Sequence, residues 1–184
     1  MTARLARERE FRREKRVFWH DRTVHKVYLS LGSNMGDRAA NIARAIEELL
    51  KRDVRVTRQS SLYETEPVEF ADQPWFLNSA IEAETDLEPK ELIKTALQIE
   101  KSMGRERRLP KGPRVIDIDI LFYDDLVIRT PELEVPHPRM SGRRFVLVPM
   151  AEIASNVVHP ALEKTIAQLL TETNDCSEVR RVPD

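Results

Sequence analysis

Two aspartates in the stretch GPRVIDIDILFY, residues 112–123, are the clearest candidates for chemistry. Asp117 and Asp119 interrupt a run of Val, Ile, Leu and Phe, although Asp is depleted in β-strands. Residues two apart on a strand point to the same face, so we expect the two carboxylates to project together. They would repel each other in a dry site, and a bound Mg²⁺ would relieve this because it prefers oxygen ligands. The alternative is that these charges protect an edge strand from aggregation.

Basic residues surround this acidic pair in the sequence. They precede it in the polar loop RERRLPKGP, open the predicted strand, and follow it after the motif VPHP: Arg105, Arg107, Arg108, Lys111, Arg114, His137, Arg139, Arg143 and Arg144. Arg binds phosphate in a bidentate manner, so the pattern indicates a site for phosphate and metal. The alternative for the loop is an ordinary solvated charge run. GSNMG has closely spaced glycines and no following Lys, which excludes a P-loop.

A second candidate cluster lies in the stretch ADQPWFLNSA. Phe76 and Asn78 are two residues apart, so a strand would place them on one face, with Trp75 and Leu77 on the other. An aromatic ring beside an amide suits a flat heterocycle, and Phe145 at the start of a predicted strand supplies a second ring. The alternative is a core Phe beside a turn-capping Asn.

The predicted elements make a globular α+β domain. Alternating patterns predict strands at 26–33, 55–67, 75–87 and 114–123, and a strand followed by a short helix at 145–154. Helical spacing predicts helices at 42–50, 88–105 and 159–170. The order βαββαβ with a C-terminal appendage favours a mainly antiparallel sheet with helices packed on it. On the last long strand, Leu121 and Tyr123 are expected to share the face of the aspartates, and Ile120 and Phe122 the core face.

Composition limits the class of protein. The chain has 184 residues, 41% hydrophobic and 33% charged, with a net charge of −1. Residues 1–26 carry nine Lys/Arg and four Asp/Glu, so we expect residues 1–25 to form a basic extension, either a solvated tail or an arm for nucleic acid or membrane. We expect the main domain at 26–172 and a polar tail at 173–184. The single Cys176 and the lack of a long apolar run favour a cytoplasmic, non-membrane protein.

Seven stretches together resemble the 6-hydroxymethyl-7,8-dihydropterin pyrophosphokinases of folate synthesis. They are YLSLGSNMGD, SSLYETEPV, DQPWFLNSAI, IEKSMGRER, GPRVIDIDILFY, VPHPRM and RRFVLVPMAEIA, in the family's order from about Val27 to Leu170. The resemblance implies a three-layer, ferredoxin-like α/β/α fold. It also implies transfer of the pyrophosphoryl group of ATP to the hydroxymethyl oxygen of the pterin, which gives AMP.

The resemblance also implies roles for individual residues. Asp117 and Asp119 would hold two Mg²⁺ ions, and together with Arg105 and Arg114 they would form the catalytic set. ATP contacts would come from Glu100, Arg105, Arg114, Ile120, His137 and Arg143. Pterin contacts would come from Thr65, Val68, Phe76, Asn78, Asp117 and Phe145. The loop from Arg105 to Pro113 would form a lid, in which Lys111 stands where many members have Trp.

Two other classes of protein remain as alternatives. One is an RNA-binding module that uses aromatic side chains on an open sheet, and the paired aspartates and acidic body disfavour it. The other is a different metal-dependent phosphotransferase or phosphohydrolase with the same Asp pair. We expect ATP and the pterin as the small-molecule partners, no nucleic acid or membrane partner, and a monomer.

Overall fold

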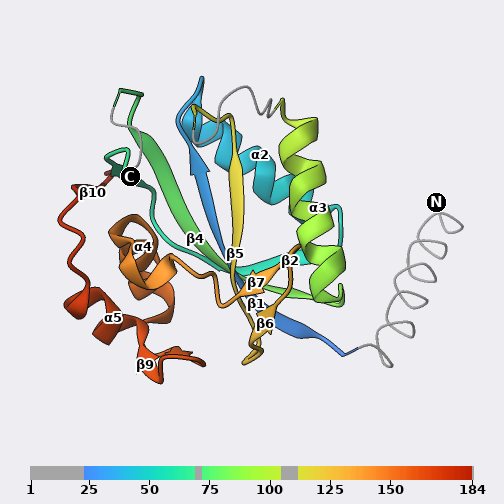
Figure 1. Cartoon of the computed structure of the whole chain (residues 1–184). Coiled ribbons are helices and arrows are strands. Elements are labelled where there is room, and N and C mark those ends of the chain that lie inside the picture. Colours follow the sequence, from blue (N-terminus) through green and yellow to red (C-terminus); the bar gives the residue numbers. More distant parts are fainter. Residues whose placement is uncertain (1–22, 69–71, 105–111, 184) are drawn as a thin grey trace, which may run out of the picture.

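The computed structural model of the chain describes residues 23–68, 72–104 and 112–183. One antiparallel sheet has the strand order β10-β3-β4-β1-β5, and β2 pairs with the other half of β4 (Figure 1). The strands of this sheet are β1 (His25–Ser33), β2 (Val54–Gln59), β3 (Tyr63–Thr65), β4 (Phe76–Thr85), β5 (Asp117–Tyr123) and β10 (Val179–Arg181). Two short hairpins are β6 (Ile128–Arg129) with β7 (Glu134–Val135), and β8 (Val158–His159) with β9 (Lys164–Thr165).

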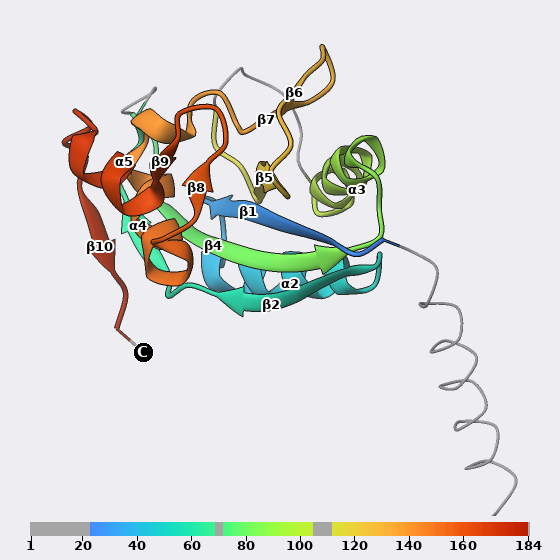
Figure 2. The ribbon, with the colours of Figure 1, turned by 90° about the horizontal axis from the view of Figure 1, so that it is seen from below.

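Helices cover both faces of the sheet. The helices are α2 (Arg38–Leu50), α3 (Pro89–Ser102), α4 (Arg144–Ala154) and α5 (Ile166–Glu172), with a 3-10 turn, η2, at Met140–Gly142. Side chains of α2 and α3 share one apolar core with β1 and β5, and those of α4 and α5 share a second core on the opposite face (Figure 2). This arrangement confirms the α+β, three-layer fold. It also buries the face that an RNA-binding module would need to keep open.

The two helices of the first layer begin at residues that cap them, and α2 begins four residues before the predicted start at residue 42. Asp37 caps α2, because its carboxylate accepts a hydrogen bond of 3.0 Å from the Ala40 N–H. Glu88 and Glu91 form a capping box at the start of α3, followed by Pro89 in the first turn. The buried residues of the two helices recur at helical spacing and pack on the sheet: Ile42, Ala45, Leu49, Leu92, Ala96 and Ile99.

The expected alternation along the last long strand is wrong after Leu121. Tyr28 pairs with Phe122 and Leu29 pairs with Ile120, so Leu121 is an extra residue in β5. Such a bulge puts two consecutive side chains on one face. Leu121 and Phe122 therefore lie in the core of α4 and α5, and Tyr123 lies in the core of α2 and α3. The carbonyl of Leu121 accepts a hydrogen bond of 3.0 Å from the His137 N–H.

Four further elements differ from the sequence predictions. The helix predicted at 159–170 begins only at Ile166, because the residues before it form the β8–β9 hairpin. The expected single strand at 55–67 is interrupted between β2 and β3, which pair with different halves of β4. Residues 145–154, predicted as strand then helix, all belong to α4, because Val146, Leu147, Met150 and Ile153 form one buried helical stripe. Residues 179–181 of the predicted polar tail form β10, which pairs with β3. The rest of the predicted domain boundaries stay predictions, since residues 1–22 lie outside the described part.

None of the helices in the described part of the chain combines the length and apolar character needed to cross a membrane.

Candidate functional site

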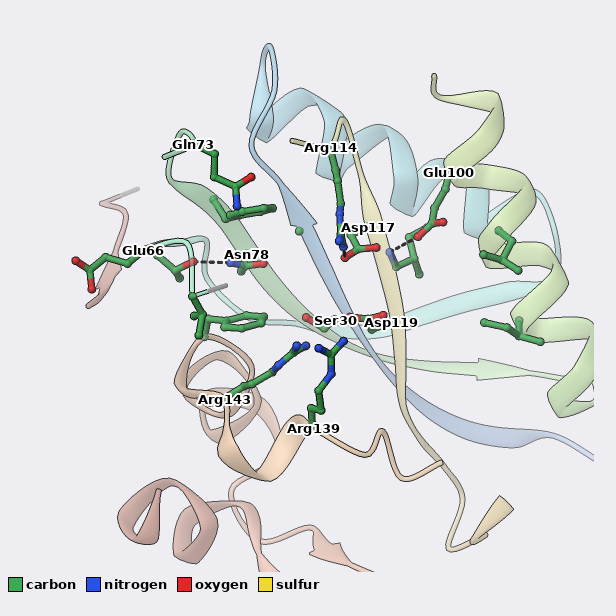
Figure 3. A pocket seen from close by; sticks show the side chains of 18 residues that line it. Ser30, Glu66, Gln73, Asn78, Glu100, Arg114, Asp117, Asp119, Arg139 and Arg143 are labelled. Atoms are coloured by element: carbon green, nitrogen blue, oxygen red, sulfur yellow. Dashed lines mark hydrogen bonds and ion pairs between the residues drawn. The ribbon is translucent and has the colours of Figure 1, made fainter. Parts of the chain in front are cut away.

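A cavity of about 310 Å³ opens over the face of the sheet on which α4 packs (Figure 3). Eleven of the residues singled out in the sequence line it: Thr65, Val68, Phe76, Asn78, Glu100, Arg114, Asp117, Asp119, Arg139, Arg143 and Phe145. The predicted acidic pair and the predicted aromatic–amide cluster therefore share one cavity, although about 40 residues separate them in the sequence.

The central strand β1 brings the two clusters together. Gly32 of β1 pairs with Asn78 of β4 on one side and with Asp117 of β5 on the other. One row of the sheet thus carries the amide, then a residue with no side chain, then the carboxylate. Ser30 lies two residues away on the same face and pairs with Asp119. The floor of the cavity between the clusters is therefore formed by Ser30 and Gly32 of β1.

The acidic side of the cavity is held by a network around Arg114. The guanidinium of Arg114 forms an ion pair with Asp117. The backbone N–H of Arg114 donates a hydrogen bond of 2.7 Å to the side-chain Oδ1 of Asn34. Asn34 is 3% exposed, and its own N–H donates to the Arg114 carbonyl at 3.0 Å. These two hydrogen bonds hold the backbone just before β5 in place. They therefore fix the position from which the side chains of Arg114 and Asp117 extend into the cavity.

Glu100 contributes to the same side from α3. It is 2% exposed, and its Oε1 accepts a hydrogen bond of 2.8 Å from the Ile118 N–H, between the two aspartates. A buried carboxylate therefore supports the strand that carries Asp117 and Asp119 (Figure 3). Ile93 and Leu97 lie on the same helix as Glu100 and also line the cavity, which gives this side an apolar wall.

The opposite side of the cavity is built around Asn78. This residue is 4% exposed, and its Nδ2 donates a hydrogen bond of 2.7 Å to Oγ1 of Thr65 on β3. The bond leaves the amide oxygen facing Gly32, where a Cβ would lie only 2.6 Å from it. Phe76 and Phe145 line this side from β4 and from the start of α4. The side therefore offers rings and an amide, as the sequence predicted, with Phe145 on a helix instead of a strand.

Two arginines enter from below in Figure 3. Arg139 and Arg143 extend from the ends of η2 toward Ser30 and Asp119, and the guanidinium of Arg143 lies 5.4 Å from the centre of the Phe145 ring. His137 does not line the cavity. Its burial, with the nearby charges of Arg143 and Arg139, lowers the pKa of His137 to about 4, so its imidazole is neutral at pH 7. Its Nδ1 accepts the Arg139 N–H at 3.2 Å and so supports Arg139.

The remaining predicted contacts fall elsewhere. Ile120 is 3% exposed and packs in the core of α2 and α3, so its side chain does not reach the cavity. Arg105 and the predicted lid lie outside the described residues, except for Gly112 and Pro113 at the end of the loop. Within the described part of the chain, no three His, Cys, Asp or Glu side chains are grouped to hold a metal ion. A cation at the Asp pair would therefore need further ligands from a substrate or water.

Several cavity residues were not among the sequence predictions for the site: Ser30, Gly32, Glu66, Gln73, Ile93, Leu97 and Ile118. Most are small, apolar or common polar residues that carry no chemical signal of their own. Among these residues, Gly32 carried a usable signal, because a Gly within a strand marks the close approach of a neighbouring group.

Comparison with known proteins shows the family of the chain. Residues 28–155 match the family model described as 7,8-dihydro-6-hydroxymethylpterin-pyrophosphokinase. The chain is 44% identical over 146 residues to the 2-amino-4-hydroxy-6-hydroxymethyldihydropteridine pyrophosphokinase of Aquifex aeolicus, covering 79% of this chain and 91% of that protein. The chain belongs to this pyrophosphokinase family. The Bacillus subtilis enzyme of the same name is 48% identical over 132 residues, covering 71% of this chain and 79% of its own length.

Longer relatives and solved structures complete the comparison. The folic acid synthesis protein FOL1 of Dictyostelium discoideum is 41% identical over 157 residues, which is 85% of this chain but 24% of that protein. The chain thus spans about a quarter of this longer relative. A crystal structure of Plasmodium falciparum HPPK-DHPS matches with a TM-score of 0.65 at 17% identity, over 85% of this chain and 44% of that one. This likeness confirms the pyrophosphokinase fold.

Proposed function

We propose that this pyrophosphokinase-family chain transfers the β,γ-pyrophosphoryl group of ATP to the hydroxymethyl oxygen of 6-hydroxymethyl-7,8-dihydropterin. The products are AMP and the pterin diphosphate. The observation that carries the proposal is the shared cavity, which joins an aromatic–amide wall to a wall of carboxylates and arginines. A flat heterocycle suits the first wall and a polyphosphate suits the second, so the two substrates would meet above Ser30 and Gly32.

The acceptor would bind on the Asn78 side. Phe76 and Phe145 would contact the faces of the pterin, and the Asn78 amide would hydrogen-bond to its edge. The hydrogen bond from Asn78 to Thr65 keeps this amide in place before the substrate arrives, which lowers the cost of ordering it. Val68 is 49% exposed at the rim of the cavity and would cover the acceptor from the side of the β3–β4 loop.

ATP would bind on the carboxylate side, with its base against the apolar wall of α3 and its phosphates near Arg114, Arg139 and Arg143. Guanidinium groups stabilise the charge that spreads over phosphate oxygens during transfer. His137 lies outside the cavity and would act through Arg139, whose N–H it binds at Nδ1. The acceptor hydroxyl forms a bond from its oxygen to the β-phosphorus and releases its proton, for which Asp119 is the candidate acceptor. The bond from that phosphorus to the α–β bridging oxygen breaks, and AMP leaves with that oxygen.

Asp117 and Asp119 fit a site for Mg²⁺. The two carboxylates project from one face of β5 into a cavity lined by cationic side chains, and Mg²⁺ commonly takes one or two carboxylates plus phosphate oxygens and water. When bound, the ion would neutralise phosphate charge and help to align the reacting oxygens. Arg114 pairs with Asp117 in this structure, so the guanidinium holds the carboxylate in position and would turn to phosphate when ATP binds. We infer two such ions from the family resemblance.

The test is an assay for AMP formation by purified protein with ATP, Mg²⁺ and the dihydropterin. We expect AMP only when both the pterin and Mg²⁺ are present, with omission of pterin and addition of EDTA as controls. Asp117→Ala and Asp119→Ala should each reduce the rate by about two orders of magnitude or more without loss of folding. Asp125→Ala, which removes a carboxylate from the exposed turn after β5, is the matched control and should remain active.

The possible results separate the parts of the proposal. ATP binding without pterin-dependent AMP would refute the acceptor. Normal turnover by either cavity variant would refute the role of that carboxylate in metal binding.

A further inference from the structure

The chain that follows α5 links two parts of the cavity that are distant in sequence. We call residues 173–182 the β10 segment. In Figure 1 this red stretch runs from α5 past α4 to the edge of the sheet, where β10 pairs with β3. No residue of the segment lines the cavity itself. Some of its hydrogen bonds nevertheless end on residues that do, or on their immediate neighbours.

At one end of the segment, Asp175 binds the first turn of α4. Its Oδ2 accepts a hydrogen bond of 2.7 Å from the Arg144 N–H, and its Oδ1 accepts one of 2.9 Å from the Ser177 N–H. The preceding residue, Arg143, makes no side-chain cap, and the first turn of α4 contains no acidic residue. Asp175 therefore supplies a carboxylate that the helix lacks, at the end where the helix dipole favours negative charge.

This capping contact lies between two cavity residues. Arg144 separates Arg143 from Phe145, and both of these line the cavity. Burial alone would raise the pKa of Asp175, but the hydrogen bonds from Ser177 and the Arg144 N–H outweigh it and lower this pKa, so the carboxylate is charged at pH 7. The position of the Phe145 ring is therefore tied to a residue 30 positions later in the chain.

At the other end, the segment binds β3. The Glu66 N–H donates to the Glu178 carbonyl at 3.2 Å, and the Glu178 N–H donates to Oε2 of Glu66 at 2.8 Å. Val179 pairs with Thr65, the residue that holds the amide of Asn78. The guanidinium of Arg180 also lies 4.9 Å from the centre of the Trp75 ring, just before β4.

We propose that the β10 segment sets the spacing between the Phe145 wall and the Thr65–Asn78 wall, and that Asp175 is its positioning residue. The inference rests on the proposed function in one respect, because it takes the acceptor to be the dihydropterin bound between these walls. A heterocycle held between two surfaces requires their separation to be fixed, and a displacement of about 1 Å is enough to reduce turnover strongly.

The first test measures binding of the dihydropterin by calorimetry, and KM for each substrate, in three variants. Asp175→Ala should raise the Kd and KM for the pterin about tenfold. The Kd for ATP should rise less, because only Arg143 of its three proposed arginine contacts adjoins the capped turn. Asp175→Asn should remain close to wild type, because Asn keeps an acceptor oxygen and caps helices about as well as Asp. Glu172→Ala removes an exposed carboxylate three residues earlier, which pairs only with Lys164 among the bonds seen here, and should change neither constant.

A purely structural role for Asp175 would lower the thermal midpoint of Asp175→Ala and leave its pterin Kd unchanged, and that result would overturn the proposal.

The second test does not depend on activity. Amide hydrogen exchange in the ligand-free protein should become faster at Arg144 in Asp175→Ala, because its N–H loses its acceptor. If the segment couples the walls, exchange at Glu66 should also become faster. Faster exchange at Arg144 alone would mean that Asp175 is only a local cap. Wild-type protein that neither binds the pterin nor forms AMP would refute the proposed function, while the exchange at Glu66 would still decide whether the walls are linked.

Discussion

Gly32→Ala tests the geometry of the cavity floor with a single methyl group. A Cβ at this position would lie 2.6 Å from Oδ1 of Asn78, and ordinary contacts begin at about 3.4 Å. The amide oxygen must therefore retreat by about 0.8 Å. Asn78 is 4% exposed and bound to Thr65 at 2.7 Å, so it has little freedom to move. The three atoms nearest to the added Cβ all belong to Asn78 and Phe76, so the disturbance is directed at the acceptor side.

The expected result is a selective loss of acceptor use. A misplacement of about 1 Å can cost about 100-fold in rate, so we expect kcat/KM for the dihydropterin to fall by about 30- to 100-fold. Overpacking costs about 1–3 kcal/mol, and replacing a Gly within a strand returns about 0.5–1 kcal/mol, so the free energy of unfolding should fall by at most about 2.5 kcal/mol. The Kd for ATP should stay within about threefold of wild type.

The assay is AMP formation at varied dihydropterin, with urea unfolding to confirm that the variant is folded. Gly142→Ala is the matched control, because a Cβ there meets nothing within 4 Å in the turn that precedes α4. A folded Gly32→Ala protein with kcat/KM within threefold of wild type would refute the reasoning that Asn78 must stay where it is. Equal losses in both glycine variants would show that the effect is not specific to the cavity floor.

Three further predictions concern residues that support the cavity. Glu100→Ala leaves the Ile118 N–H without its acceptor, so urea unfolding should show a loss of about 1–3 kcal/mol, whereas Glu100→Gln should recover most of it. Asn34→Ala removes the acceptor of the Arg114 N–H, and kcat should fall more than tenfold in the AMP assay while circular dichroism stays native. The pKa of His137 is about 4 in the folded protein and 6.5 in the unfolded chain, so at pH 5 the unfolded chain binds a proton that the folded protein does not. The free energy of unfolding should therefore be lower at pH 5 than above pH 6.5, by about 2 kcal/mol. Urea unfolding at pH 7 and pH 5 should therefore show a smaller loss in His137→Gln than in wild type, and equal losses would contradict this.

The sequence predicted the parts of the fold that depend on local signals. Helical spacing marked the two helices of the first layer, with Pro89 near the start of the second, and strand alternation placed Phe76 and Asn78 on one face. The carboxylate pair and the aromatic–amide cluster were identified from residue types alone. The family resemblance then linked them, because nothing in a single sequence states that β4 and β5 flank the same strand.

The errors arose where tertiary contacts override local pattern. The bulge at Leu121 reverses the faces of Phe122 and Tyr123, and it depends on pairing with β1, which alternation alone does not reveal. Residues 145–154 are rich in β-branched and aromatic side chains, yet packing on the sheet selects a helix. β10 was assigned to a tail because its residues are mostly charged; it is an edge strand, where a polar outer row is expected.

The end of β1 explains why the two halves of the site cannot move independently. The side-chain Oδ1 of Asn34 accepts a hydrogen bond from the backbone N–H of Arg114. The Nδ2 of the same amide donates at 3.1 Å both to Oε1 of Gln73 and to the Pro74 carbonyl. Arg114 belongs to the carboxylate side, and Gln73 lines the cavity next to the acceptor side. One buried amide thus joins the chain before β5 to the chain before β4, two residues beyond the glycine that separates Asp117 from Asn78. Because transfer between two substrates depends on their alignment, a single strand end that fixes both binding walls provides that alignment before either substrate binds.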